Sequence, residues 1–183
     1  MPNEEQNLQY PIGPENEAEY YNSRYDENTK IQLLHDIKML PANLEYAIQN
    51  LDVPELETPY RPGGWTVKQL IHHVADSHIN AYIRYKLGLT EQNPTIKPYD
   101  QDAWAQLPDT ENLPVNISLT LLHALHARWY QLMYDMTPDQ WQLTIYHPQR
   151  QTTLSLWDLL KIYSWHSRHH TAHITSLRER MRW

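Results

Sequence analysis

Four of the eleven histidines fall within eight residues near the C-terminus: His166, His169, His170 and His173. The residues around them have the apolar spacing of a helix. Two histidines four residues apart on a helix lie one turn, about 6 Å, apart, so that both can bind one ion. Neutral imidazole is the commonest protein ligand of divalent transition metals. This segment therefore predicts a metal site.

The spacing of these histidines allows two pairs, His166 with His170 and His169 with His173. At 100° per residue, the apolar stripe of the same helix passes through His170 and leaves His169 and His173 together on one flank. The first pair therefore has the more central position, and the second pair lies at an edge. Helical phase alone does not choose between the pairs.

A third ligand is sought in residues 66–88, where a second amphipathic helix is predicted. His78 falls inside the apolar arc of this helix and is predicted to be a hydrogen-bonded core or interface histidine. His72 is predicted to face solvent. His73 lies at the edge of the arc beside Ser77, where a side chain can reach a neighbouring helix and still contact water. The best candidate ligand here is His73.

The residue after His169 is His170 and not glutamate, so the pattern is not the His-Glu-x-x-His of zinc peptidases, in which the glutamate is the general base. Peptidase chemistry is therefore disfavoured. The candidates for a proton acceptor are Asp76, one turn after His73, and His166. Either side chain could instead orient a metal-binding imidazole.

The composition limits the chemistry further. The chain has 183 residues, which suits one domain with a real core, and it has no cysteine. Thiolate-bound zinc, iron–sulfur clusters and a cysteine nucleophile are excluded, so any metal ligands are nitrogen or oxygen atoms. No apolar run approaches the ~20 residues that cross a membrane, and the N-terminus does not read as a signal peptide. A cytoplasmic protein with no membrane partner is expected.

The formal net charge of −7 is concentrated at the N-terminus. Seven acidic residues fall among residues 1–28 against one arginine, Arg24, and the rest of the chain is nearly neutral. Nucleic-acid binding needs lysine and arginine gathered into a stripe. No such stripe is evident, and no nucleic-acid partner is expected.

Four long helices are predicted from apolar periodicity. They cover residues 26–51, with Pro41 as a kink, 66–88, 118–136 and 155–183. Thr66 with Gln69, and Ser155 with Asp158, form capping boxes. The predicted fold is an all-α four-helix bundle with a long crossover at residues 90–116 and a small β-hairpin at residues 143–154 before the last helix. Within the crossover, one short helix is expected around residues 102–107.

The predicted domain boundaries divide the chain in two. Residues 1–24 are expected to form an irregular acidic arm without helix or strand, and residues 25–183 a single metal-binding bundle.

Several sequence blocks resemble the DinB superfamily, and within it the YfiT type of metal-dependent hydrolases. The likeness covers residues 8–183. The blocks are Tyr10-Pro11-Ile12-Gly13, Thr58-Pro59-Tyr60-Arg61, Gly63-Gly64-Trp65-Thr66-Val67, His72-His73-Val74-Ala75-Asp76-Ser77-His78, Lys97-Pro98-Tyr99-Asp100, and Trp165-His166-Ser167 with His169-His170-Thr171-Ala172-His173-Ile174.

The resemblance implies a four-helix bundle, commonly a homodimer, that holds one divalent ion, Zn²⁺ or Ni²⁺, through three histidines. Carried onto this sequence, the ligands are His73, His169 and His173. The chain departs from the family at Arg168, where another histidine is frequent, but that position is not one of the implied ligands.

Three histidine ligands leave a coordination position open, which is the arrangement of a catalytic site. Such an ion lowers the pKa of bound water toward ~7 and polarises a carbonyl or phosphoryl oxygen. The leading hypothesis is a metal-dependent hydrolase of a small molecule. One alternative is a transferase of a low-molecular-weight thiol of the bacillithiol type, since a bound thiol is deprotonated by the same charge. A second alternative is a non-catalytic metal-binding dimer module.

Overall fold

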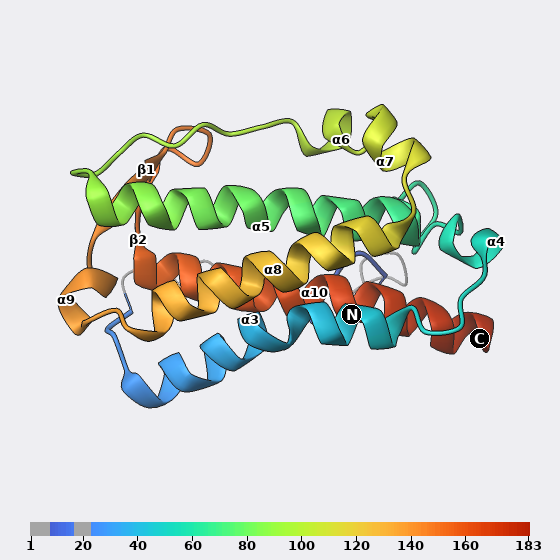
Figure 1. The fold of residues 1–183 in the computed structure, drawn as a ribbon, viewed down its shortest axis with the longest axis horizontal. Coiled ribbons are helices and arrows are strands. Elements are labelled where there is room, and N and C mark those ends of the chain that lie inside the picture. Colours follow the sequence, from blue (N-terminus) through green and yellow to red (C-terminus); the bar gives the residue numbers. More distant parts are fainter. Residues whose placement is uncertain (1–7, 17–22) are drawn as a thin grey trace.

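The structure is a computed structural model that describes residues 8–16 and 23–183. Figure 1 shows four long helices packed along a common direction. They form a closed ring in which α3 contacts α8 and α10, and α5 contacts the same two helices. The four helices are α3 (Glu27–Ala47), α5 (Val67–Thr90), α8 (Val115–Tyr134) and α10 (Leu156–Met181). The predicted four-helix bundle is confirmed.

Because of the long crossover, α8 runs in the same direction as α5. In Figure 1 the chain runs the length of α5, returns along the outside of the bundle, and then runs the length of α8 in the same direction as α5. α3 and α10 run in the opposite direction. Two short helices, α6 (Gln101–Trp104) and α7 (Pro108–Asn112), interrupt this return segment, where the sequence predicted one.

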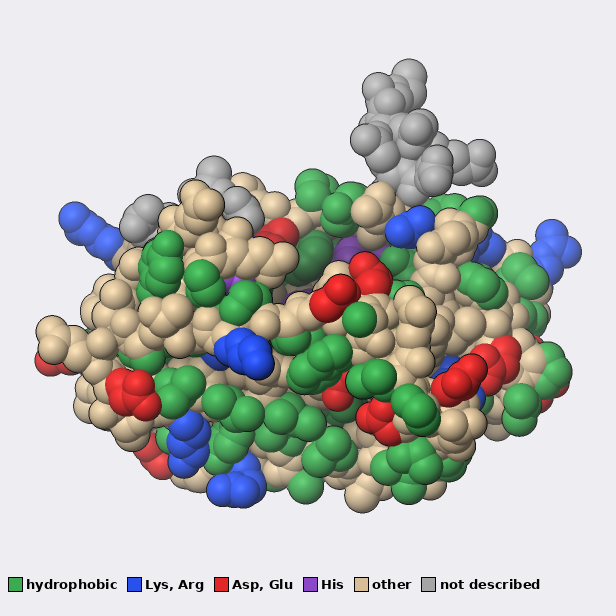
Figure 2. All heavy atoms as spheres, turned by 90° about the horizontal axis from the view of Figure 1, so that it is seen from above, with side chains coloured by type: hydrophobic (Ala, Val, Ile, Leu, Met, Phe, Trp, Pro, Cys, Tyr) green, Lys and Arg blue, Asp and Glu red, His purple; other side chains and the backbone are tan. Residues whose placement is uncertain are grey.

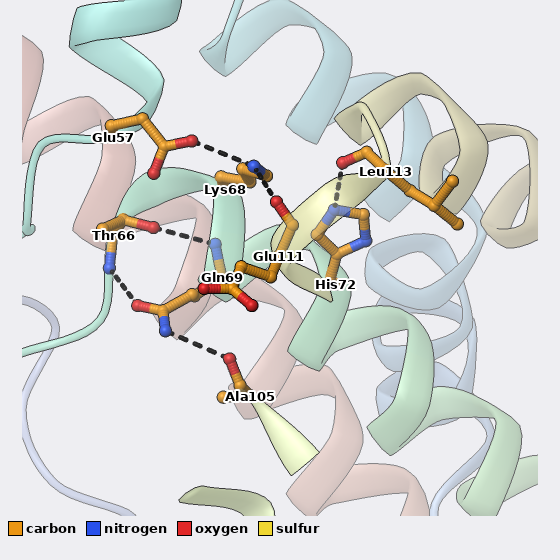
Figure 3. A network of polar contacts seen from close by, with 8 residues as sticks. All are labelled: Glu57, Thr66, Lys68, Gln69, His72, Ala105, Glu111 and Leu113. Carbon is orange, nitrogen blue, oxygen red and sulfur yellow. Dashed lines mark hydrogen bonds and ion pairs between the residues drawn. The ribbon is translucent and has the colours of Figure 1, made fainter. Parts of the chain in front are cut away.

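The crossover is fastened to the first turns of α5, as Figure 3 shows. Gln69 donates from Nε2 to the carbonyl oxygen of Ala105 at 3.1 Å. Lys68 donates from Nζ to the carbonyl oxygen of Glu111 at 2.7 Å and forms an ion pair with Glu57 at 3.0 Å. These contacts hold the crossover over the half of α5 that carries His73.

Both predicted capping boxes are present. The Thr66 side chain accepts from the backbone N–H of Gln69 while the Gln69 side chain accepts from the backbone N–H of Thr66. Ser155 and Asp158 make the same reciprocal pair at the start of α10. Each box satisfies N–H groups that the first turn of a helix leaves unpaired. The starting points of α5 and α10 therefore follow from local sequence.

α3 is one helix that includes Pro41, and Pro41 is buried in it. The expectation about the arm was wrong in one respect. In the arm, Leu8 and Gln9 are helical although no helix was expected there. The Gln9 carbonyl oxygen accepts a hydrogen bond from His173 of α10, so this part of the arm is ordered by a tertiary contact that local sequence does not report.

The predicted hairpin is formed by β1 (Thr144–His147) and β2 (Thr152–Ser155), which pair antiparallel with Thr144 opposite Ser155. The crossover extends the hairpin edge, since the N–H of Ile96 donates to the carbonyl oxygen of Tyr146. Two single-turn helices complete the described elements, α4 (Val53–Leu56) and α9 (Pro138–Trp141). No described helix is long and apolar enough to cross a membrane.

Histidines separate two apolar clusters inside the bundle. One cluster surrounds Trp129 and contains the apolar residues of α10 from Leu156 to Tyr163, and the other surrounds Leu122 and contains Ile174 and Leu177. The four C-terminal histidines lie between these two stretches of α10. The core is therefore polar at its middle, which is unusual unless the polar groups have partners.

Candidate metal centre

Five histidines from two helices converge at this middle section. His73 comes from α5, and α10 contributes the other four, His166, His169, His170 and His173. All five line one cavity of about 380 Å³. Figure 2 shows histidine side chains at the floor of a hollow in the face seen from above.

The histidines form two groups among the described residues. The candidate ligand atoms of His73, His166 and His170 lie within 4.8 Å of one another, and so do those of His169, His170 and His173. The ring centroid of His73 lies 5.5 Å from that of His166 and 5.0 Å from that of His170. His170 belongs to both groups.

The ligands implied by the family resemblance are distributed over these two groups. His169 and His173 lie together, with ring centroids 4.2 Å apart. His73 lies instead with His166 and His170, the pair that helical phase placed more centrally. Among the described residues, His73, His169 and His173 do not form one of the groups of three with ligand atoms within 4.8 Å.

A chain of three histidines runs from the centre into the core. His166 Nδ1 lies 3.0 Å from His78 Nε2, and His78 Nδ1 lies 2.9 Å from His126 Nε2. His126 Nδ1 lies 2.6 Å from the carbonyl oxygen of Ile37. The carbonyl can only accept, so His126 carries its hydrogen on Nδ1.

The hydrogen on His126 Nδ1 fixes the positions of the hydrogens on the other two histidines when the rings are neutral, because a neutral imidazole has one donor and one acceptor. His126 Nε2 must accept from His78 Nδ1, and His78 Nε2 must accept from His166 Nδ1. His166 is left with an unprotonated Nε2. That atom lies 3.5 Å from Ser77 Oγ, at the centre.

A second chain acts on His170 in the same way. His173 Nε2 lies 3.0 Å from the carbonyl oxygen of Gln9 and must donate to it. His173 Nδ1 is then an acceptor, 3.4 Å from His170 Nδ1. A hydrogen on His170 Nδ1 completes this weaker contact and leaves His170 Nε2 unprotonated. A metal-binding histidine usually donates a hydrogen bond from its other ring nitrogen, and in this centre a neighbouring imidazole nitrogen accepts it.

Burial keeps these rings neutral. It lowers the pKa of His73 to about 4, and that of His126 also to about 4. The pKa values of His78, His166 and His170 lie well below the ordinary value, first because of burial and then because of neighbouring histidines. Burial and His173 lower the pKa of His169 to about 3, and its buried Nδ1 has no hydrogen-bond partner among the described residues.

The other two histidines of α5 had opposite outcomes. His78 is a hydrogen-bonded core residue, as predicted. His72 was predicted to face solvent, which is wrong, because it is buried between α8 and the crossover. His72 Nε2 donates to the carbonyl oxygen of Leu113 at 3.2 Å (Figure 3), and Nδ1 accepts from Ser118 Oγ at 2.7 Å. The phase calculation assumed that α5 is covered on one side only, but the crossover covers a second side.

Aromatic rings and the arm cover the centre. Trp65 packs on His73, Tyr60 stacks on His173, and Trp165 stacks on His169, with ring centroids 4.4, 4.0 and 4.3 Å apart. Trp165 donates from Nε1 to the carbonyl oxygen of Gly13 at 3.3 Å. These rings reduce the access of water to the imidazoles.

A larger cavity of about 940 Å³ adjoins the centre. It lies between α5, α10, the crossover and the hairpin turn, and shares His166 with the smaller cavity. Its volume suits a small organic molecule.

The structure separates the two candidate proton acceptors. His166 lies in the centre, whereas Asp76, half-buried on α5, does not line either cavity among the described residues. Burial, and secondly the charge of Asp109, raise the pKa of the Asp76 carboxyl to about 6.

Sequence reasoning missed His126, which ends the first chain. The signal was available: α8 has a buried stripe at Leu119, Leu122, Trp129 and Met133, and His126 occupies the same helical face. A histidine within an apolar stripe needs a polar partner, and here it has two. The hydrogen bond between His173 and the Gln9 carbonyl oxygen had no comparable signal in the sequence.

Comparisons with known proteins agree with this architecture. A family model described as the DinB superfamily matches residues 37–174. A protein of Bacillus mycoides (strain KBAB4), named "Putative metal-dependent hydrolase", is 49% identical over 176 residues, which cover 96% of this chain and 98% of that protein. A protein of Bacillus anthracis (strain CDC 684 / NRRL 3495) with the same description has the same identity and coverage.

A solved structure is also similar. YfiT from Bacillus subtilis, described as a probable metal-dependent hydrolase with an unusual four-helix bundle topology, superposes with a TM-score of 0.92. It is 43% identical in sequence, and the match covers 97% of this chain and 99% of YfiT.

Proposed function

The chain belongs to the DinB superfamily, and we propose that it is a metal-dependent hydrolase of a small molecule. The observation that carries this proposal is the convergence of neutral, buried imidazoles beside a cavity of about 940 Å³. The names of its relatives support the same reaction class.

The donor set fits a divalent transition metal, with Zn²⁺ and Ni²⁺ as the proposed ions. Imidazole nitrogen suits both ions, and ligation requires the neutral ring that burial favours here. When bound, the ion supplies Lewis acidity, which polarises a carbonyl or phosphoryl oxygen and makes water a stronger nucleophile.

The ligand set that we propose is His73, His166 and His170. Two features support it: the three candidate ligand atoms lie close together, and the two hydrogen-bond chains leave Nε2 of both His166 and His170 unprotonated. The set His73, His169 and His173 is the alternative. His173 Nε2 is engaged by the Gln9 carbonyl oxygen, which favours a supporting role for this ring.

The other residues around the centre shield the imidazoles from water or hold His166 in one protonation form. Trp65, Tyr60 and Trp165 limit water around the imidazoles. His78 and His126 hold the hydrogen of His166 on Nδ1. We do not assign Asp76 to the reaction, because it lines neither cavity among the described residues.

The proposed activity is tested with the zinc-loaded, nickel-loaded and chelator-treated protein on a panel of ester, amide and phosphoester substrates. Hydrolysis that disappears with the metal and returns with it supports the proposal. The same preparations are assayed for conjugation of low-molecular-weight thiols to bimane electrophiles. Thiol conjugation without any hydrolysis would instead indicate a transferase.

A metal that only stabilises the fold gives a third result. The chelator then lowers the melting temperature, and neither assay shows turnover in any preparation. The homodimer implied by the resemblance remains a proposal, which sedimentation equilibrium tests directly.

A further inference from the structure

The larger cavity has two chemically different ends. Ser77 and His166 line the end at the histidine centre, and Arg84 and His147 line it farther along α5 and the hairpin. Arg84 follows Ser77 by seven residues on α5, so the two positions are about 10 Å apart along the helix axis. Arg84 is therefore about two helical turns of α5 away from the histidine end of the cavity.

The Arg84 guanidinium is held in place by a neutral hydrogen-bond partner. Arg84 is half-buried, and its Nη1 donates to the hydroxyl oxygen of Tyr163 at 2.9 Å. Among the described residues, no carboxylate lies within 4.0 Å of its guanidinium. A partly buried guanidinium without an acidic partner is available to an anionic ligand.

His147 adds a second donor at this end. The backbone N–H of Arg150 donates to His147 Nδ1 at 3.3 Å. Burial, followed by the charges of Arg84 and Arg150, lowers the pKa of His147 to about 4, so the ring is neutral at pH 7. With Nδ1 as the acceptor, the hydrogen lies on Nε2, which is a donor.

The acidic side chains that line this cavity have donors of their own. Asp100 accepts from the backbone N–H groups of Asp102 and Ala103 at the start of α6. Asp102 accepts from Trp65 Nε1 at 3.1 Å. The rim already holds one carboxylate, since both terminal nitrogens of Arg150 donate to Glu15, at 3.1 and 3.0 Å.

We propose that the Arg84 end of the cavity binds a carboxylate or phosphate group, so that the substrate is an anionic small molecule. The guanidinium fork matches both groups in a bidentate arrangement. The anionic group lies about 10 Å along the helix axis from the bond that reacts at the histidine centre. The anion site stands on the cavity and its donors, and its assignment to the substrate rests on the proposed hydrolase function.

Binding of anions is measured first, without turnover. The full-length protein, metal-free and zinc-loaded, is titrated with suberate and with inorganic phosphate while NMR follows the arginine Nε–H signals. The metal-free titration isolates Arg84, because an ion can itself bind anions. We expect Arg84→Gln to weaken binding at least about tenfold, and Arg84→Lys to fall between this variant and the wild type.

The matched control is Arg128→Gln, which removes an exposed arginine of α8 outside the cavity and should bind as the wild type does. Tighter binding of suberate or of phosphate identifies the preferred group. Absence of binding of both, or equal binding by Arg84→Gln and the wild type, would overturn the anion site.

Turnover is measured second, on two esters of equal length. The mono-p-nitrophenyl ester of suberic acid carries a free carboxylate, and its methyl ester is neutral. We expect a KM about tenfold lower for the acid, and loss of this preference in Arg84→Gln. Equal KM values in the wild type would overturn the anionic substrate while hydrolysis stands. If neither these esters nor any substrate of the ester, amide and phosphoester panel reacts, but suberate still binds through Arg84, the hydrolase proposal fails and the anion site stands.

Discussion

At the scale of single residues, hydrogen bonds distinguish histidines that are equivalent in the sequence. His166 and His169 have the same spacing to a second histidine on α10. His166 has its Nδ1 bound to His78 and its Nε2 at the centre, whereas the buried His169 Nδ1 has no partner in the part of the chain that the structure describes. A ring whose one nitrogen is held by a hydrogen bond presents the other to a metal at lower entropic cost.

Asp76 provides a prediction about stability at this scale. The folded protein raises the pKa of its carboxyl to about 6, so it holds this proton more tightly than the unfolded chain. The contribution of this carboxyl to stability therefore falls as the pH rises from about 4 through 6, whereas the buried histidines act in the opposite direction. Asp76→Asn should stabilise the protein at pH 7 by on the order of 1 kcal/mol, a value reduced for its partial exposure to solvent.

Urea unfolding of Asp76→Asn and of the wild type at pH 4 and pH 7 measures this effect. The gain should appear at pH 7 and vanish at pH 4. Metal content and turnover should stay within about threefold of the wild type, since Asp76 lines neither cavity among the described residues. A hundredfold loss of turnover, the size expected for a general base, would restore Asp76 as the proton acceptor.

The sequence reached the candidate centre through residue type and spacing. His73 was expected to converge with histidines of α10, and its candidate ligand atom lies in a group with those of His166 and His170 rather than with those of His169 and His173. The choice between the two pairs was not accessible, because it depends on His126 of α8 and Gln9 of the arm. Hydrogen bonds between segments that are distant in sequence leave no periodic signal.

At the scale of elements, the bundle supports one proposed ligand through a neighbouring helix. His126 lies on α8, His78 on α5 and His166 on α10, so the chain joins three of the four long helices. It ends at the Ile37 carbonyl oxygen on the fourth, α3. The proton arrangement of the centre therefore depends on the packing of the whole bundle.

Replacing His126 should weaken metal binding without touching the ion's ligands. In His126→Leu, His78 loses its acceptor and the hydrogen of His166 is no longer confined to Nδ1. We expect about tenfold weaker zinc affinity, as is typical for loss of an outer partner. His126→Gln restores an acceptor and should recover part of the affinity. Competition with a chelator measures the affinity, and the ¹⁵N shifts of His166 report where its hydrogen lies.

The control for this variant is Leu122→Ala, which removes a buried side chain of the same helix. It should destabilise the fold by about 2–5 kcal/mol and leave both the zinc affinity and the His166 shifts unchanged. If His126→Leu binds zinc no more weakly than Leu122→Ala, the hydrogen-bonded row of His126, His78 and His166 has only a structural role.

The elements themselves were largely predictable because their signals are local. Capping boxes marked where α5 and α10 begin, and the apolar stripes marked which faces are buried. The exposure of His72 was predicted wrongly, since the second cover of α5 comes from a crossover with no periodic pattern. Local sequence reported where each helix starts, but not everything that packs on it.

At the scale of the whole molecule, a core built around neutral histidines makes the fold sensitive to acid. Burial lowers the pKa of His73 and His126 to about 4, whereas an exposed ring titrates near 6.5. Below pH 6.5 the histidines of the unfolded chain become protonated, whereas the buried rings of the folded protein stay neutral until the pH is lower. The stabilising contribution is present above pH 6.5 and is lost as the pH falls toward about 4.

This predicts a steep decline in the unfolding free energy of the metal-free protein between pH 6.5 and pH 4. Each buried ring adds up to about 1.4 kcal/mol per pH unit. Urea unfolding at several pH values measures how steeply the unfolding free energy changes with pH. This slope reports the number of protons taken up on unfolding, and His126→Gln should lower that number by up to one. A stability that stays constant from pH 7 to pH 5 would show that the rings are not held neutral.

We propose that His73, His166 and His170 hold the ion. The most direct test of this ligand set is the zinc content of the purified, zinc-reconstituted protein after dialysis, compared among single alanine variants with the exposed His35→Ala as control. We predict that His73→Ala, His166→Ala and His170→Ala lose most of the zinc, while His169→Ala and His35→Ala retain it. Full zinc content in His166→Ala and His170→Ala, with loss in His169→Ala, would rule out this ligand set.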